Sequence, residues 1–212
     1  ILKKNTIYEN MYHLKVIVEN RLINYAGKEL SMDLKLIYDG SISDINYEYE
    51  DNYYHLPYGW SLNYQQRVIK AKEEETYMYL NGGGQRYYFI KEKNNLYVEE
   101  KGIGHILEIE ENRIKIKGIR NQEYVFNKEG YLIAIYSQEK SLFITYEEKQ
   151  GYGKVLTRIK DSSQRQITIE YKEKQIEIIR SDANKVIIKI ENGEIQQKYL
   201  VVHFKMQFQL HL

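Results

Sequence analysis

The feature that most constrains the fold is an alternation of apolar and polar residues with a period of two. It recurs in segments 105–110 (HILEIE), 113–118 (RIKIKG), 166–172 (QITIEYK) and 185–191 (KVIIKIE). In the third of these, Ile167, Ile169 and Tyr171 fall on one face and polar residues on the other. Successive side chains of a β-strand point to opposite faces, and Ile, Val, Tyr and Thr pack well on a pleated surface. Each segment is therefore predicted to be a strand that is buried on one face only.

Short turn signals separate these segments. They are Asn94-Asn95, Lys101-Gly102, Glu111-Asn112, Gly118, Glu129-Gly130, Gly151 to Gly153 and Asn192-Gly193. Glycine and asparagine supply the positive φ angles that tight hairpin turns need. No convincing helical stripe is present. The pattern predicts an all-β fold built as an antiparallel β-hairpin meander.

Composition excludes several classes of protein. The 212 residues carry 31 basic and 30 acidic side chains, for a net charge of +1, so neither a nucleic-acid partner nor a polybasic membrane patch is indicated. Cysteine is absent, which excludes disulfides and Cys-based zinc sites. No run of eighteen apolar residues predicts a transmembrane segment. The sequence starts at Ile1 and shows no signal peptide, so we expect an excerpt or a processed product.

The sequence offers no persuasive catalytic, cofactor-binding or metal site. NGGG (81–84) lacks the Lys-Ser/Thr of a phosphate-binding loop and is predicted to be a β-turn. No histidine lies within two to four residues of another, so surface or packing roles are expected for His13, His55, His105, His203 and His211. Acidic and tyrosine residues mix in the loop 42–55, for which we favour a solvated loop over a calcium or sugar site.

Two stretches suggest a worn internal repeat. Segments 132–146 (LIAIYSQEKSLFITY) and 156–171 (LTRIKDSSQRQITIEY) each hold an apolar pair, a polar turn and a β-branched run. They close on Tyr146 and Tyr171, respectively. Each repeat reads as a hairpin that cannot bury its face alone, so stacking of hairpins is implied.

The rarest residues are concentrated in 56–68 (LPYGWSLNYQQRV), which holds the single proline and the single tryptophan of the chain. Proline suits the entry to a strand, and the following glycine permits a close turn. The run is interpreted as a structural motif, with Trp60, Leu62 and Tyr64 sharing a face. The motif residues are Pro57, Gly59, Trp60, Ser61, Asn63 and Tyr64.

Taken together, these motifs resemble the Rhs (YD-repeat) family of polymorphic toxins, including the wall-associated proteins of Gram-positive bacteria. The matching segments are LKLIYDGS (34–41), GWSLNY (59–64), YLNGGGQRYYFI (79–90), GYLIAI (130–135) and VLTRIKDSSQRQITIEY (155–171). The resemblance covers roughly residues 14–196. It departs from the family's Asp-x-x-Gly-Arg turn at Ser137, which stands in place of the aspartate, and at Gln164, which replaces the glycine.

The resemblance implies a curved, spiralling sheet that forms part of a shell around a C-terminal toxin or other cargo. It divides the chain into an N-terminal β region (1–80), degenerate hairpin repeats (81–196) and an atypical strand-like tail (197–212). The implied partner is the rest of the same polypeptide, and the implied location is secreted or cell-surface-associated. The implied role is structural, with no catalysis and no cofactor. A cut spiral would expose its inner face, so association between copies is expected.

Two other functions stay open. A carbohydrate- or cell-surface-binding module would use Tyr53 and Trp60 as stacking platforms for glycans. A glycoside hydrolase would need two carboxylates about 5–9.5 Å apart in a concave site.

Overall fold

The protein is built from β-strands alone in the part of the chain that its structure describes. A computed structural model describes residues 6–10, 15–25, 30–39, 56, 59–71, 75–119, 121–150, 152–191 and 194–201, and no helix occurs among them. The strands are β1 (Thr6–Asn10), β2 (Lys15–Tyr25), β3 (Met32–Asp39), β4 (Trp60–Leu62), β5 (Arg67–Lys70), β6 (Thr76–Leu80), β7 (Arg86–Lys93), β8 (Leu96–Glu99), β9 (Ile106–Ile109), β10 (Arg113–Ile119), β11 (Gln122–Asn127), β12 (Leu132–Ser137), β13 (Lys140–Lys149), β14 (Gly153–Asp161), β15 (Gln166–Lys172), β16 (Gln175–Arg180), β17 (Lys185–Glu191) and β18 (Glu194–Val201). The predicted all-β class is confirmed.

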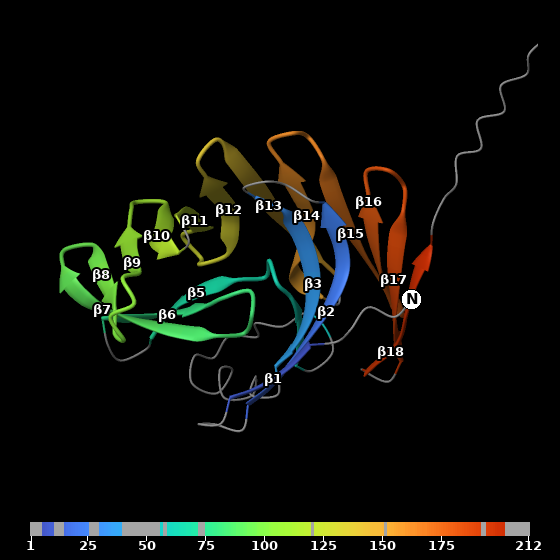
Figure 1. Ribbon diagram of the computed structural model, residues 1–212, viewed down its shortest axis with the longest axis horizontal. Helices are drawn as coiled ribbons and strands as arrows, with labels where there is room; N and C mark the ends of the chain where they lie inside the picture. The colour runs from blue at the N-terminus through green and yellow to red at the C-terminus, as the bar shows by residue number, and fades with distance from the viewer. Residues whose placement is uncertain are drawn as a thin grey trace, which may run out of the picture.

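These strands form two antiparallel sheets in the described residues (Figure 1). The smaller sheet has the order β1-β2-β3-β4, and the larger one runs through fourteen strands from β5 to β18. Within each sheet every strand pairs with its neighbour in sequence, and every pairing is antiparallel. The sheets divide between β4 and β5. The predicted hairpin meander is therefore present in both.

The alternating segments became strands with the expected faces. Segments 166–172 and 185–191 coincide with β15 and β17. In β15, Ile167 and Ile169 are buried, and Glu170 on the opposite face is exposed. In β10, Ile116 is fully buried and its neighbour Lys117 is exposed. Period-two patterning thus located the buried inner face of these strands, but the prediction of burial on one face only is wrong for β17, where Ile187 on the opposite face is 7% exposed.

One five-residue turn recurs four times among the described residues. In each copy the first residue's carbonyl accepts from the amide of the fourth, and its amide donates to the carbonyl of the fifth. The fourth residue always has a positive φ, which is what lets the chain reverse. The copies begin at Asn81, Asn127, Asp161 and Arg180, and their fourth residues are Gly84, Gly130, Gln164 and Ala183.

In three of these turns the first side chain adds a further hydrogen bond. The Oδ1 atoms of Asn81, Asn127 and Asp161 each accept from the amide of the fifth residue at 2.9 Å. Arg165 also pairs with Asp161 through Nε at 2.7 Å. An Asp or Asn is favoured at the first position because its Oδ1 atom accepts a hydrogen bond from the backbone amide of the fifth residue. The turn predicted at 81–84 is confirmed.

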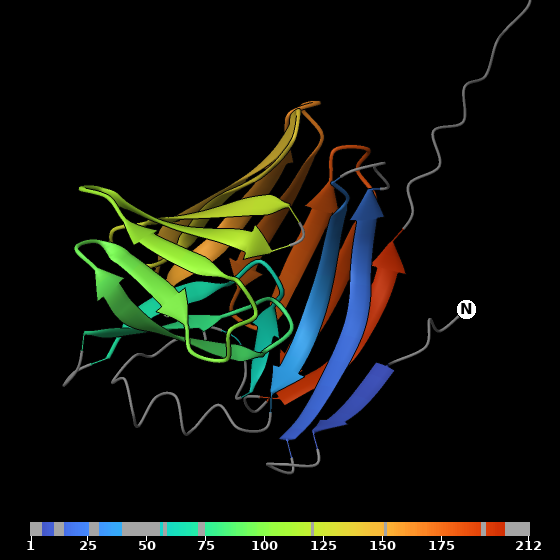
Figure 2. The same ribbon diagram turned by 60° about the vertical axis from the view of Figure 1, so that its left-hand side comes forward.

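The smaller sheet packs on one face of the larger, and the main hydrophobic core lies between them. Met32, Leu34 and Leu36 of β3 are buried in the same cluster as Ile176 and Ile178 of β16. In Figure 1, β2 and β3 lie in front of β14 and β15, and Figure 2 shows them against the orange and red strands of the larger sheet. The expectation that the inner face would be exposed is therefore wrong for the described residues, because β2 to β4 supply the apolar side chains that cover it.

Tyr25 fastens the two sheets together at the end of β2. Its hydroxyl lies 2.8 Å from Ser181 Oγ and accepts from the Ser181 amide at 3.0 Å. The guanidinium carbon of Arg180 lies 4.4 Å from the centre of the Tyr25 ring, and that of Arg165 lies 5.4 Å away. A buried ring with a bonded hydroxyl between two cations holds the sheets in one relative position.

The larger sheet curls until its first strand meets the turn before β12. We call this contact the seam. Val68 donates to the Gly130 carbonyl at 2.9 Å, Leu132 donates to the Gln66 carbonyl at 3.3 Å, and Arg67 forms an isolated antiparallel bridge with Tyr131. This contact is an isolated bridge with two flanking hydrogen bonds, and the sheet continues from β12 to β18 beyond it.

Candidate functional site

The motif predicted at 59–64 forms the joint between the two sheets. Gly59 has a φ of +81°, and a Cβ there would lie 2.7 Å from the ring of Tyr38. Trp60 follows in β4, half-buried, with its ring centre 5.2 Å from that of Tyr38. Glycine is required at this position because the conformation is left-handed and the Tyr38 ring occupies the space. Pro57 lies outside the described residues.

Asn63 and Tyr64 bind the motif to β3. Asn63 Oδ1 accepts from the Lys35 amide at 2.8 Å, and its Nδ2 donates to the Asp33 carbonyl at 2.9 Å. The Tyr64 hydroxyl accepts from the Asp33 amide at 3.2 Å. Asn63 thus imitates a strand's backbone and extends the pairing of β3 past the short strand β4. Burial raises the pKa of Tyr64 well above its usual range.

The next residues carry the joint into the larger sheet. Gln66 Nε2 donates to the Asn63 carbonyl at 3.1 Å, while its Oε1 accepts from the buried Tyr79 hydroxyl at 2.5 Å. Gly82 lies so close that a Cβ would stand 2.2 Å from the Asn63 carbonyl oxygen. Leu62 and Tyr64 are buried, as predicted for the face they share with Trp60. The motif therefore connects β3 to the larger sheet through side-chain hydrogen bonds.

The closing tyrosines of the two repeats each donate a hydrogen bond to a backbone carbonyl. Tyr146 donates to the Tyr64 carbonyl at 3.0 Å, and Tyr171 donates to the Leu156 carbonyl at 3.0 Å. Burial raises the pKa of both hydroxyls well above the usual range. Each ring covers the inner core while its hydroxyl satisfies a carbonyl that faces that core. Tyr146 also ties its hairpin to the joint.

Few of the other predicted site residues can be placed. His105 is half-buried, with its ring centre 5.3 Å from that of Tyr87, and burial lowers its pKa. The other four histidines, the loop 42–55 and the tail residues 202–212 lie outside the described residues, whereas 197–201 belong to β18. Among the described residues no group of three or more His, Asp or Glu could hold a metal ion. That same part of the chain has no helix long and apolar enough to span a membrane.

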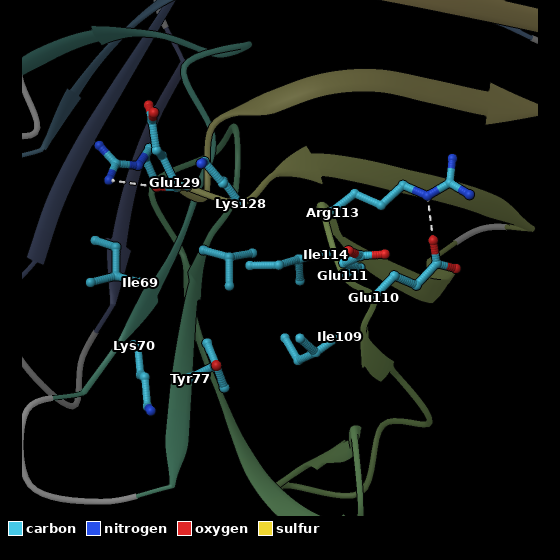
Figure 3. Close-up of a pocket in the computed structure, with 12 residues that line it drawn as sticks. Ile69, Lys70, Tyr77, Ile109, Glu110, Glu111, Arg113, Ile114, Lys128 and Glu129 are labelled. Atoms are coloured by element: carbon cyan, nitrogen blue, oxygen red, sulfur yellow. Dashed lines mark hydrogen bonds and ion pairs between the residues drawn. The ribbon is translucent and has the colours of Figure 1, made fainter.

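The structure brings together a pocket that the sequence did not indicate. It encloses about 400 Å³ beside the seam, between the β5–β6 hairpin, the β9–β10 turn and the β11–β12 turn. We call it the seam pocket. Figure 3 shows Tyr77, Ile109 and Ile114 at its centre, with Lys70 on one side and the Glu110–Arg113 pair on the other. Its residues come from four separate segments, so no local pattern could have predicted it.

Two of the three carboxylates that line the seam pocket, those of Glu110 and Glu129, form ion pairs. Glu110 pairs with Lys115 and Arg113, and hydrogen bonds from these two cations lower its pKa. Glu129 pairs with Lys154, which lowers its pKa likewise. Both groups are therefore anionic at neutral pH. Neither has the raised pKa that a carboxylic acid needs to donate a proton at that pH.

Positive charge is buried at the back of the same pocket. The Arg67 guanidinium, on a residue only 7% exposed, donates to the Glu129 carbonyl at 3.2 Å. Its central carbon lies 3.9 Å from the centre of the Tyr131 ring. The pocket therefore combines an apolar floor, ion-paired carboxylates and a buried cation, which is an arrangement suited to binding.

Comparison with known proteins adds no relative. No protein-family model matches the chain, and no curated protein matches it.

Proposed function

We propose that this chain is a non-catalytic structural segment of a YD-repeat shell, which encapsulates or presents a C-terminal toxin or other cargo. We place the whole protein outside the cell or on its surface, where such cargo acts. The observation that carries the proposal is the uninterrupted meander from β5 to β18, in which each hairpin pairs only with its neighbours. A sheet of this kind grows by adding hairpins and has no built-in limit on its length.

The recurring turn supports the same proposal. The Asp161–Arg165 turn has the form of the family's Asp-x-x-Gly-Arg signature, with Gln164 in the glycine position at a φ of +66°. Asn127 and Gly130 reproduce the same hydrogen bonds in a different hairpin. The same backbone hydrogen bonds thus close several hairpins of this chain, as the proposed series of similar hairpins requires.

The smaller sheet suggests where the segment lies in such a shell. Its apolar residues fill the inner face of β15 to β17 and leave that part of the sheet packed against side chains. We therefore assign the segment to a filled end of the shell, with the joint at 59–66 fixing this sheet in place. The cargo would be enclosed by hairpins farther along the polypeptide.

The rival functions gain less support. A glycosidase needs a protonated acid, and both ion-paired carboxylates of the seam pocket have lowered pKa values. A carbohydrate-binding module needs an open aromatic platform, and Trp60 is half-buried against Tyr38. Tyr53 lies outside the described residues.

The proposal is tested on the polypeptide encoded by this segment together with its downstream coding sequence. We expect further hairpin repeats with Asp-x-x-Gly-Arg turns and a C-terminal portion that resists limited proteolysis. The control is the same C-terminal portion expressed alone, which should be digested quickly. Two results would refute the proposal. One is a downstream sequence without such repeats, and the other is a C-terminal portion that is digested at the same rate within the longer polypeptide as when it is expressed alone.

A further inference from the structure

We propose that the seam pocket is a binding site for a small organic carboxylate with an aromatic or branched aliphatic body. This inference is independent of the shell function, because it uses only the side chains that line the pocket. Pockets that bind small molecules combine apolar surface with polar groups that fix orientation, and the described lining of the seam pocket has five apolar or aromatic and seven charged residues. The volume of about 400 Å³ lies at the small end of the range for such sites.

The apolar body would lie on the floor of the pocket. Val68 and Ile114 line the pocket, and they are buried, at 3% and 7% exposure. Tyr77 and Ile109 are half-buried beside them and keep surface that a ligand could cover. Tyr77 is also held edge-on by Tyr97, with ring centres 4.9 Å apart, so its ring is preorganised.

The charges around the floor select an anion. Glu110 and Glu129 are already paired with Lys115, Arg113 and Lys154. On the rim, Lys70 and Lys128 are exposed and form no ion pair with any described residue. Against these stands one acidic side chain outside any ion pair among the described residues, the exposed Glu111.

This balance leaves an excess of positive charge beside an apolar surface. A carboxylate would gain Coulomb attraction and charge-assisted hydrogen bonds from the lysines, while an ammonium of the same shape would be repelled. A neutral alcohol would keep the apolar contact and lose the attraction. The site is therefore expected to bind the carboxylate more tightly than the alcohol, and the alcohol more tightly than the ammonium.

The experiment is a titration followed by NMR, with 4-phenylbutyrate, 4-phenylbutylamine and 4-phenylbutanol as probes. We expect saturable shifts of the Val68, Ile109 and Ile114 methyl groups with the carboxylate. The amine should bind at least about tenfold more weakly, because the two exposed lysines attract the carboxylate and repel the ammonium group. Raising the salt concentration should narrow this difference.

A matched pair of variants separates charge from general surface effects. The double variant Lys70→Gln/Lys128→Gln should lose the preference for the carboxylate while keeping the spectrum of a folded protein, because both side chains are exposed. The control Lys101→Gln/Lys174→Gln removes two exposed lysines elsewhere and should leave binding unchanged. Equal binding of all three probes, shifts that map to another surface, or no saturable shift would each overturn the proposal.

Discussion

The guanidinium carbon of Arg67 lies 3.9 Å from the centre of the Tyr131 ring, and this contact spans the seam of the larger sheet. Only a short stretch of backbone pairing joins the two segments, through the bridge between the same two residues and the flanking hydrogen bonds. A planar cation stacked on a ring, with a further bond to the Glu129 carbonyl, gives this narrow contact much of its specificity.

Replacing Arg67 with lysine should destabilise the fold although it keeps the charge. Lysine has no planar face to stack on Tyr131 and a different geometry of donors toward Glu129. We expect a loss of about 1–3 kcal/mol in the free energy of unfolding, measured by urea denaturation. The control, Arg158→Lys, changes an exposed arginine of β14 and should shift the midpoint very little. Equal midpoints for the two variants would count against the stacking.

Gly130 and Gly102 provide a second matched comparison. Both have a positive φ, of +82° and +71°. A Cβ at Gly130 would lie 1.8 Å from the Val68 carbonyl oxygen, whereas nothing lies within 4 Å of one at Gly102. Gly102→Ala should therefore cost only the backbone strain of about 1–2 kcal/mol. Gly130→Ala should cost distinctly more in the same denaturation experiment, because the seam must open. Similar costs would mean that the seam does not form as described.

Asn63→Ala tests the joint between the sheets. The change removes both side-chain bonds to β3 and leaves the Lys35 amide and the Asp33 carbonyl without this partner. We expect the free energy of unfolding to fall by about 1–3 kcal/mol and hydrogen exchange at the Lys35 amide to become faster. Asn112→Ala, at an exposed turn position, is the control. Unchanged exchange at Lys35 would show that Asn63 is dispensable.

Stability should fall at alkaline pH through the buried tyrosines. Burial raises the pKa of Tyr146 and Tyr171 in the folded state above the value of about 10 in the unfolded chain. Their contribution to the free energy of unfolding is therefore fully present below about pH 10. It is lost as the pH rises further, because the hydroxyls then release their protons in the unfolded chain but not in the folded one. Each group should add about 1.4 kcal/mol per pH unit to the decline.

The double variant Tyr146→Phe/Tyr171→Phe isolates this effect. At pH 7 its free energy of unfolding should be about 1–3 kcal/mol lower than that of the parent protein, because the substitutions remove two hydrogen bonds. Between pH 10 and 11 its free energy of unfolding should decline less steeply than that of the parent protein. Urea denaturation at a series of pH values measures both quantities, with the exposed Tyr136→Phe as the control. An unchanged alkaline slope in the double variant would contradict the assignment.

Much of the local structure could be predicted from sequence, and the reason is the period of a strand. Alternation in 166–172 located β15 and its buried Ile167 and Ile169, since side chains of one face repeat every second residue. Turn residues such as Gly130 were predictable because few residues adopt a positive φ.

The long-range arrangement could not be predicted in the same way. Alternation marks which face of a strand is buried but not what covers it, so the packing of β3 on β16 was missed. The contact of Tyr25 with Ser181 joins residues 156 positions apart, and no local pattern records it. The seam pocket was missed for the same reason, because its lining comes together only when β5 meets the β11–β12 turn.

The central claim is that this segment is one end of a longer shell of hairpins. The most direct measurement is a cryo-EM structure of the polypeptide encoded by this segment and its downstream sequence. The account predicts that β18 pairs with a further strand and that the meander continues around an enclosed space, with β1 to β4 packed at one end. A sheet that ends at β18, followed by a separate domain of another fold, would contradict it.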